Sequence, residues 1–107
     1  EAPGVHIEDP LRALERAVAV MGDRADIVIV LSNASLEMDR VLASTVEGID
    51  VIVGGGQPAL DEPERDERTG TLIVCPGYPG RSLGLLHVEF DSQGRIAGHT
   101  WTRKLLP

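Results

Sequence analysis

The sequence predicts a single α/β domain over residues 1–107, in which a βαβ unit is followed by antiparallel strands. Two β-branched runs, residues 26–31 and 50–53, flank a segment whose apolar residues recur at helical spacing. The C-terminal third instead alternates apolar and polar residues on both sides of a turn-forming sequence, which is typical of a β-hairpin. A chain of 107 residues has room for one hydrophobic core.

Composition and charge limit the classes of partner. The formal net charge of −7 repels phosphate backbones, so we do not expect a nucleic acid partner. No apolar run approaches the roughly 20 residues that a membrane-spanning helix needs. The one cysteine, Cys75, cannot form an internal disulfide, and no cysteine pair has the spacing of a zinc or haem motif.

The N-terminal part predicts a short strand and then a helix. Residues 1–8 read as an extended strand, and Asp9 is a good N-cap for a helix that begins at Pro10. Gly22 and Asp23 should end this helix. Its predicted apolar face consists of Leu11, Leu14, Val18 and Met21.

The middle of the chain predicts the βαβ unit. The run at 26–31 reads as a strand covered on both faces, as in parallel sheets. A second helix should begin after Ser35, extend to about Thr45 and be closed by Gly48, before the next buried strand at 50–53. The apolar side of this helix is predicted to be Leu36, Met38, Val41 and Leu42.

The remaining chain predicts a loop, a strand and a hairpin. Residues 57–70 are rich in acidic residues and read as a solvated excursion, whereas residues 71–75 read as a further strand. Residues 91–95 form the predicted hairpin turn. We therefore expect a mixed sheet with helices on one face. In the hairpin, Leu86, Val88 and Phe90 should face one side, and Leu85, His87 and Glu89 the other.

The candidate site is the run of Gly54, Gly55 and Gly56 that ends the strand at 50–53. Ligands of open α/β sheets bind beyond the carboxyl ends of the strands, and Asn33 follows the neighbouring strand. The glycines could form an anion-binding nest of backbone N–H groups, or they could simply form a tight turn. Asn33 and Gln57 could together hold a polar ligand, or they could satisfy their own loops.

Five segments in order resemble a known family. They are Asp26-Ile-Val-Ile-Val-Leu-Ser-Asn33, Leu36-Glu-Met-Asp-Arg-Val-Leu-Ala43, Gly48-Ile-Asp-Val-Ile-Val-Gly-Gly55, Gly70-Thr-Leu-Ile-Val74 and Gly80-Arg-Ser-Leu-Gly84. Together they resemble the second half of the calcineurin-like metallophosphoesterase domain, in its 5'-nucleotidase branch. The resemblance implies half of a four-layer αββα sandwich and, in active members, a metal pair that hydrolyses phosphate esters.

The sequence departs from this family at the metal ligands. Asn33, Gly56 and Pro58 stand where the family's second half has three histidines. The first half, with its own ligand motifs, is missing from this chain. Because glycine has no side chain and proline offers no ligand atom, a family-type metal site cannot be built from these positions. We therefore expect no catalytic residues, no metal ligands and no cofactor.

Two functions remain open on these grounds. The first is a non-catalytic structural or interaction module. The second is part of a metal-dependent phosphoesterase whose metal ligands come from a missing first half or a partner chain, which would then supply a divalent metal pair. Tyr78 and Arg81 lie in the loop that supports the site in 5'-nucleotidases, and Arg81 could contact a phosphate or pair with a local carboxylate.

We predict structural roles for the cysteine, the tryptophan and the histidines of the chain. Cys75 at a strand end and Trp101 near the C-terminus are expected to pack in the fold, although Trp101 could also mark a contact patch. His87 and His99 lie on the two arms of the hairpin and could be cross-strand neighbours. With His6, they are expected to be surface residues of strands, not metal ligands.

Half of the family's sandwich would leave an apolar sheet face uncovered, which costs about 25 cal/mol per Å² of exposed apolar surface. We therefore expect a protein partner or a homo-oligomer to cover that face. Family members are often secreted or periplasmic, so the resemblance favours an extracytoplasmic location. The chain begins at Glu1 without a signal peptide, and we expect a processed chain or a piece of a longer one.

Overall fold

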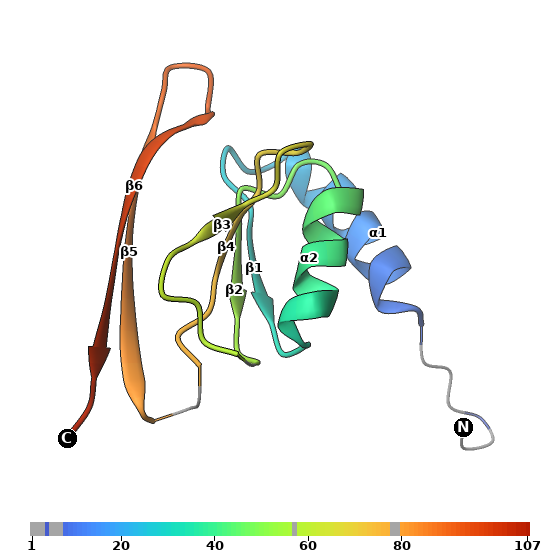
Figure 1. Cartoon of the computed structure of the whole chain (residues 1–107). Helices are drawn as coiled ribbons and strands as arrows, with labels where there is room; N and C mark the ends of the chain where they lie inside the picture. The colour runs from blue at the N-terminus through green and yellow to red at the C-terminus, as the bar shows by residue number, and fades with distance from the viewer. Residues whose placement is uncertain (1–3, 5–7, 57, 78–79) are drawn as a thin grey trace.

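The computed structural model describes residues 4, 8–56, 58–77 and 80–107, which form three layers (Figure 1). Two helices pack on one face of a four-stranded sheet, and a two-stranded hairpin covers part of its other face. This arrangement confirms the α/β class and the order of a βαβ unit before antiparallel strands. The elements are α1 (Pro10–Gly22), β1 (Ile29–Ser32), α2 (Leu36–Thr45), β2 (Val51–Gly54), β3 (Glu64–Arg65), β4 (Leu72–Val74), β5 (Ser82–Phe90) and β6 (Ile96–Leu105).

The strands form two sheets, not the single mixed sheet that the sequence predicts. The larger sheet has the order β1-β2-β4-β3, in which β1, β2 and β4 are parallel and β3 is antiparallel to β4. Within the described residues, strands β5 and β6 pair with each other and form a separate two-stranded sheet. The reason is the amphipathic pattern of the hairpin. Its inner side chains, among them Leu86 and Val88, pack face to face on Val51, Leu72 and Val74.

Both helices begin at the predicted caps. The Asp9 carboxylate accepts a hydrogen bond from the Leu11 N–H at 3.0 Å, and the Ser35 hydroxyl accepts one from the Met38 N–H at 3.1 Å. The predicted apolar faces are partly wrong, because α2 turns Asp39 and Ala43 toward the sheet together with Leu36 and Leu42. The exposed fractions are 48% for Met21, 38% for Met38 and 45% for Val41.

Strand β1 is not covered on both faces as its sequence predicts. Its register pairs Ile29 with Val51 and Leu31 with Val53, so these side chains share the face on which the hairpin packs. Nevertheless Ile29 is 56% exposed and Leu31 is 82% exposed. The physical reason is position, because β1 lies at the edge of the sheet and the hairpin does not reach over it.

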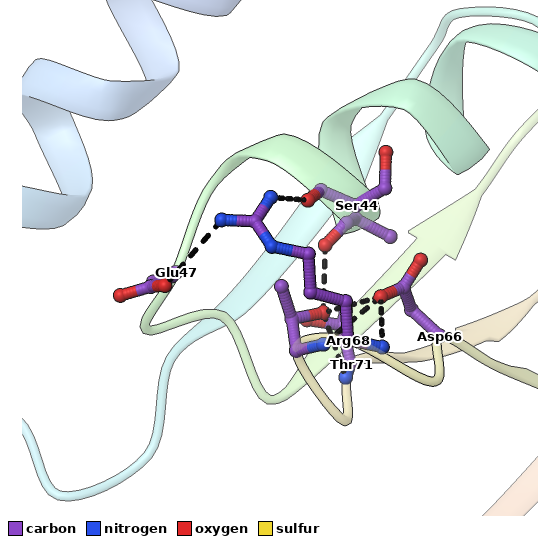
Figure 2. Close-up of polar contacts among 7 residues, drawn as sticks. Ser44, Glu47, Asp66, Arg68 and Thr71 are labelled. Carbon is purple, nitrogen blue, oxygen red and sulfur yellow. Dashed lines mark hydrogen bonds and ion pairs between the residues drawn. The ribbon is translucent and has the colours of Figure 1, made fainter.

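Residues 58–70, the described part of the segment predicted as a solvated excursion at 57–70, are more ordered than predicted. They contain β3, and their turn packs against the end of α2 (Figure 2). Asp66 Oδ1 accepts hydrogen bonds from the N–H groups of Arg68 and Thr69, both at 2.9 Å. Thr69 Oγ1 donates to the Ala43 carbonyl at 2.7 Å, and Arg68 Nη1 donates to the Ser44 carbonyl at 2.6 Å. The turn therefore satisfies carbonyls that the end of α2 leaves without helical partners.

Replacing Thr69 by Val should lower the free energy of unfolding by about 1–2 kcal/mol, because the carbonyl of the buried Ala43 loses its donor. Urea denaturation measures this change. Thr100→Val, at an exposed position of β6, is the matched control and should stay within about 0.5 kcal/mol of the wild type. Equal losses in the two variants would show that the contact of Thr69 with α2 contributes nothing.

The hairpin confirms the predicted turn and the packing of Trp101. Leu86 pairs with Trp101 across the strands, and the indole ring lies against Gly84, where an added Cβ would be 2.2 Å from Trp101 Cη2. His87 and His99 are not cross-strand neighbours. The register pairs His87 with Thr100 and Val88 with His99, so the two imidazoles lie on opposite faces of the hairpin.

The strand predicted for residues 1–8, with His6, lies almost entirely outside the described residues. In the part of the chain that the structure describes, no helix is long and apolar enough to cross a membrane.

Candidate functional site

The candidate site lies at the carboxyl ends of β1 and β2. Ser32 and Gly54 are paired at the last position of the two parallel strands, and the Gly55 N–H donates to the Ser32 carbonyl at 2.7 Å. The loops that follow the two strands therefore run side by side. This contact also bears on the proposed anion nest, because the N–H of Gly55 already has an acceptor within the protein.

The structure brings some of the sequence-predicted residues together. Asn33 is exposed, and its side-chain oxygen lies next to Gly55, where an added Cβ would be 3.8 Å from Asn33 Oδ1. Pro58 and Arg81 are also exposed. Gln57 and Tyr78 lie outside the described residues, so the predicted pairing of Asn33 with Gln57 stays a prediction.

Gly56 is held where no side chain fits. A Cβ at this position would lie 2.3 Å from the carbonyl oxygen of Ala34, which is far inside contact distance. On the other side, the thiol of Cys75 donates to the Gly56 carbonyl at 3.0 Å, and Cys75 is buried. The thiol is thus a packing and hydrogen-bonding group, as its strand-end position predicts. The turn is closed tightly around a glycine.

A buried carboxyl group lies beneath this turn, and the sequence reasoning missed it. Asp39 is 1% exposed, and its Oδ1 accepts a hydrogen bond of 2.5 Å from the Ser32 hydroxyl. Its other oxygen lies 2.6 Å from where a Cβ of Gly54 would be. Asp39 therefore links α2 to the ends of both β1 and β2, and it requires a glycine at position 54.

Helical spacing could have revealed Asp39. It lies three residues after Leu36 and three before Leu42, both buried, so it falls on the buried face of α2. Burial raises the pKa of the Asp39 carboxyl above its usual range, and the hydrogen bond from Ser32 opposes this shift in part.

The raised pKa of Asp39 predicts a pH-dependent stability. Above the ordinary carboxyl pKa of 3.8, the unfolded chain releases the proton of Asp39 while the folded chain still holds it. The free energy of unfolding should therefore fall as the pH rises through the window that starts near this value. Asp39→Asn keeps the shape of the side chain but removes its titratable proton. As the pH rises, the free energy of unfolding of the wild type should therefore fall relative to that of this variant. Urea denaturation at a series of pH values measures the difference, and parallel profiles would contradict the prediction.

The side chains at the site offer few of the ligand atoms that a transition metal needs. Within the described residues, no three His, Cys, Asp or Glu side chains gather as a metal-binding group. Of the three positions at which the resemblance implies histidines, only Asn33 has a side-chain ligand atom, an amide oxygen that suits hard cations. The residues present do not fit a dinuclear zinc or iron site.

Comparison with solved structures defines the class of protein. The fold matches a 5'-nucleotidase precursor from Thermus thermophilus with a TM-score of 0.80 and 24% identity, covering 98% of this chain and 24% of that one. It also matches the sulfate thiohydrolase SoxB from Thermus thermophilus with a TM-score of 0.74 and 27% identity, covering 99% of this chain and 19% of that one. The chain therefore has the α/β fold of one part of these two larger proteins.

Sequence comparison narrows this class. The 5'-nucleotidase of Rattus norvegicus is 30% identical over 115 residues, which cover 88% of this chain and 20% of the relative. No family model matches the chain. The suspected resemblance is confirmed, since the chain is 5'-nucleotidase-like and corresponds to part of a domain. It spans 19–20% of the length of the curated 5'-nucleotidases that it matches.

Proposed function

We propose that this chain is a non-catalytic, 5'-nucleotidase-like interaction module. The observation that carries the proposal is the close contact between Gly56 and Ala34. At a position where the family has a histidine, an added Cβ would lie 2.3 Å from a backbone oxygen. The backbone is thus fitted to glycine, and a histidine there would require the two loops to separate. The other two positions at which the resemblance implies a histidine also have no imidazole, because they are occupied by Asn33 and Pro58.

The interaction role is supported by apolar surface that the fold leaves open. Leu31 of β1 is 82% exposed on the face that elsewhere packs under the hairpin. Leu83 and Leu85 of β5, which are 62% and 70% exposed, lie on the opposite, outer face of the hairpin. Covering one large aliphatic side chain contributes about 1.5–3 kcal/mol to an association, so these residues favour a protein partner or a second copy of the chain.

A second candidate function is part of a metal-dependent phosphoesterase whose ligands come from another chain. One observation favours it, because Asn33 is exposed and its amide oxygen lies beside Gly55, which is also exposed. In this arrangement a divalent metal pair would be bound mainly by the partner. We propose an extracytoplasmic location in either case, because one structural neighbour is a 5'-nucleotidase precursor.

Metal content and turnover distinguish the two functions. The chain is loaded with manganese or zinc, passed through a desalting column, and assayed for bound metal and for hydrolysis of a chromogenic phosphate ester. We expect neither stoichiometric metal nor turnover. Turnover that is lost when a chelator is added would overturn the non-catalytic proposal.

A further inference from the structure

The loop between β1 and α2 contains a tripeptide that can be covalently modified. Asn33-Ala34-Ser35 has the pattern Asn-x-Ser with a residue other than proline in the middle, which is the acceptor motif for N-linked glycosylation in exported proteins. Asn33 is also the only asparagine of the chain. An N-linked saccharide on this chain can therefore be attached only at this position.

The structure leaves both functional side chains of this motif accessible. Strand β1 ends at Ser32 and α2 begins at Leu36, so the motif forms the whole connection between them. Asn33 and Ser35 are exposed, and Ala34 between them is half-buried. A bulky, hydrophilic saccharide needs a surface position of this kind, because it cannot be accommodated in a close-packed core. The motif thus lies where the fold can carry a saccharide.

The side-chain amide of Asn33 can be modified without the loss of an internal contact. In the part of the chain that the structure describes, this amide forms no hydrogen bond with another residue. Its oxygen lies beside Gly55, where an added Cβ would be 3.8 Å away, and this glycine has no side chain to obstruct a bulky group. An amide nitrogen carries two hydrogens, so replacing one of them removes no hydrogen bond on which the fold depends.

We propose that Asn33 is a site of N-linked glycosylation. The inference rests on the extracytoplasmic location proposed above, because the motif is used in exported proteins. The Asn33 amide nitrogen attacks the anomeric carbon of a saccharide that is carried on a lipid diphosphate. A carbon–nitrogen bond forms and the carbon–oxygen bond to the diphosphate breaks. The lipid diphosphate leaves with the electron pair, and the amide nitrogen gives up one proton.

The cap of α2 indicates when this transfer takes place. The motif requires the hydroxyl group of Ser35, but in the folded chain this hydroxyl accepts a hydrogen bond from the Met38 N–H at 3.1 Å. The Ala34 N–H is held as well, since it donates to the Ser32 hydroxyl at 3.1 Å. We therefore expect the transfer to precede the capping of α2, on the unfolded chain during export.

A saccharide on Asn33 would also affect the candidate site. The loop that carries Asn33 runs beside Gly55 at the carboxyl ends of β1 and β2, because the Gly55 N–H donates to the Ser32 carbonyl at 2.7 Å. This edge is where open α/β sheets bind their ligands. A saccharide there would obstruct the approach of a phosphate ester, which is consistent with the non-catalytic function proposed above.

The test compares the wild-type protein with variants in the cells that make it. Protein from the exported fraction is digested with trypsin, which releases peptide 25–40 by cleaving after Arg24 and Arg40. Mass spectrometry of this peptide detects a saccharide and locates it. We expect the saccharide in the wild type and its complete loss in Asn33→Gln. Ser35→Asp should also abolish it while keeping α2 intact, because aspartate caps helices as well as serine does.

The matched control is Ser35→Thr, because threonine keeps the acceptor motif and can still cap the helix. Its peptide 25–40 should remain glycosylated. Circular dichroism of the purified variants checks that all of them are folded. The pair Ser35→Asp and Ser35→Thr therefore separates the requirement for the motif from the requirement for the cap.

Two outcomes would overturn the inference: an exported protein in which peptide 25–40 is entirely unmodified, or a saccharide that remains on this peptide in Ser35→Asp. A protein found only in the cytoplasm would overturn the proposed location and this inference with it. All three results leave the non-catalytic proposal standing, since only chelator-sensitive hydrolysis contradicts that one.

Discussion

Leu72→Ala is expected to lower the free energy of unfolding by about 2–5 kcal/mol, the largest effect of the substitutions considered. Leu72 has an exposed fraction of 0% and lies on β4 between the sheet and the hairpin. Truncation removes apolar contacts and leaves a cavity, because β4 is held by backbone pairing with β2 on one side and β3 on the other and cannot close around it. Chemical denaturation followed by circular dichroism measures the loss.

The matched control for Leu72 is Leu31→Ala. The residue type is the same and the side chain lies on the same face of the sheet, but Leu31 is 82% exposed. Its truncation should change the free energy of unfolding of the isolated chain by no more than about 0.5 kcal/mol. Comparable losses in the two variants would mean that β1 is covered in solution, for example in an oligomer.

Gly56→His is expected to lower the free energy of unfolding by about 1–3 kcal/mol and to leave metal binding undetectable. The imidazole would add the side chain that the resemblance implies at this position, but its Cβ would lie 2.3 Å from the Ala34 carbonyl oxygen, so the loops after β1 and β2 must separate. Denaturation measures the stability, and metal analysis after zinc loading measures binding.

Gly22→Ala is the control for this substitution. Gly22 ends α1, and a Cβ there would have no heavy atom within 4 Å. Its stability should stay within about 0.5 kcal/mol of the wild type or rise slightly. A Gly56→His variant that is as stable as wild type and binds zinc stoichiometrically would show that the turn opens readily, and the non-catalytic proposal would lose its main support.

Local signals predicted the elements well. Asp9 and Ser35 mark the starts of the helices because short polar side chains cap the first free N–H groups, a requirement that does not depend on tertiary context. The hairpin turn at 91–95 was equally clear, since Asp91 Oδ1 accepts hydrogen bonds from the backbone N–H groups of Gln93 and Arg95 within the turn itself.

Burial was predicted less well, for a physical reason. The β-branched pattern of residues 26–31 is the same whether a strand lies in the centre or at the edge of a sheet, and only the position of the hairpin exposes Leu31. The turn at 66–70 likewise looks solvated by composition, yet Thr69 reaches the Ala43 carbonyl at 2.7 Å. Such contacts join residues 26 positions apart, beyond any local signal.

The sequence by itself determined the class of fold, the caps, the hairpin and the 5'-nucleotidase resemblance, because each depends on residues that are close in the chain or on an ordered set of motifs. It also determined that Asn33, Gly56 and Pro58 cannot supply histidine ligands. Only the tertiary structure decided that Asp39 is buried under the glycine turn, that Gly56 abuts Ala34, and that β1 is left uncovered. These features arise where separate elements meet, and packing between them, not propensity within them, sets the distances.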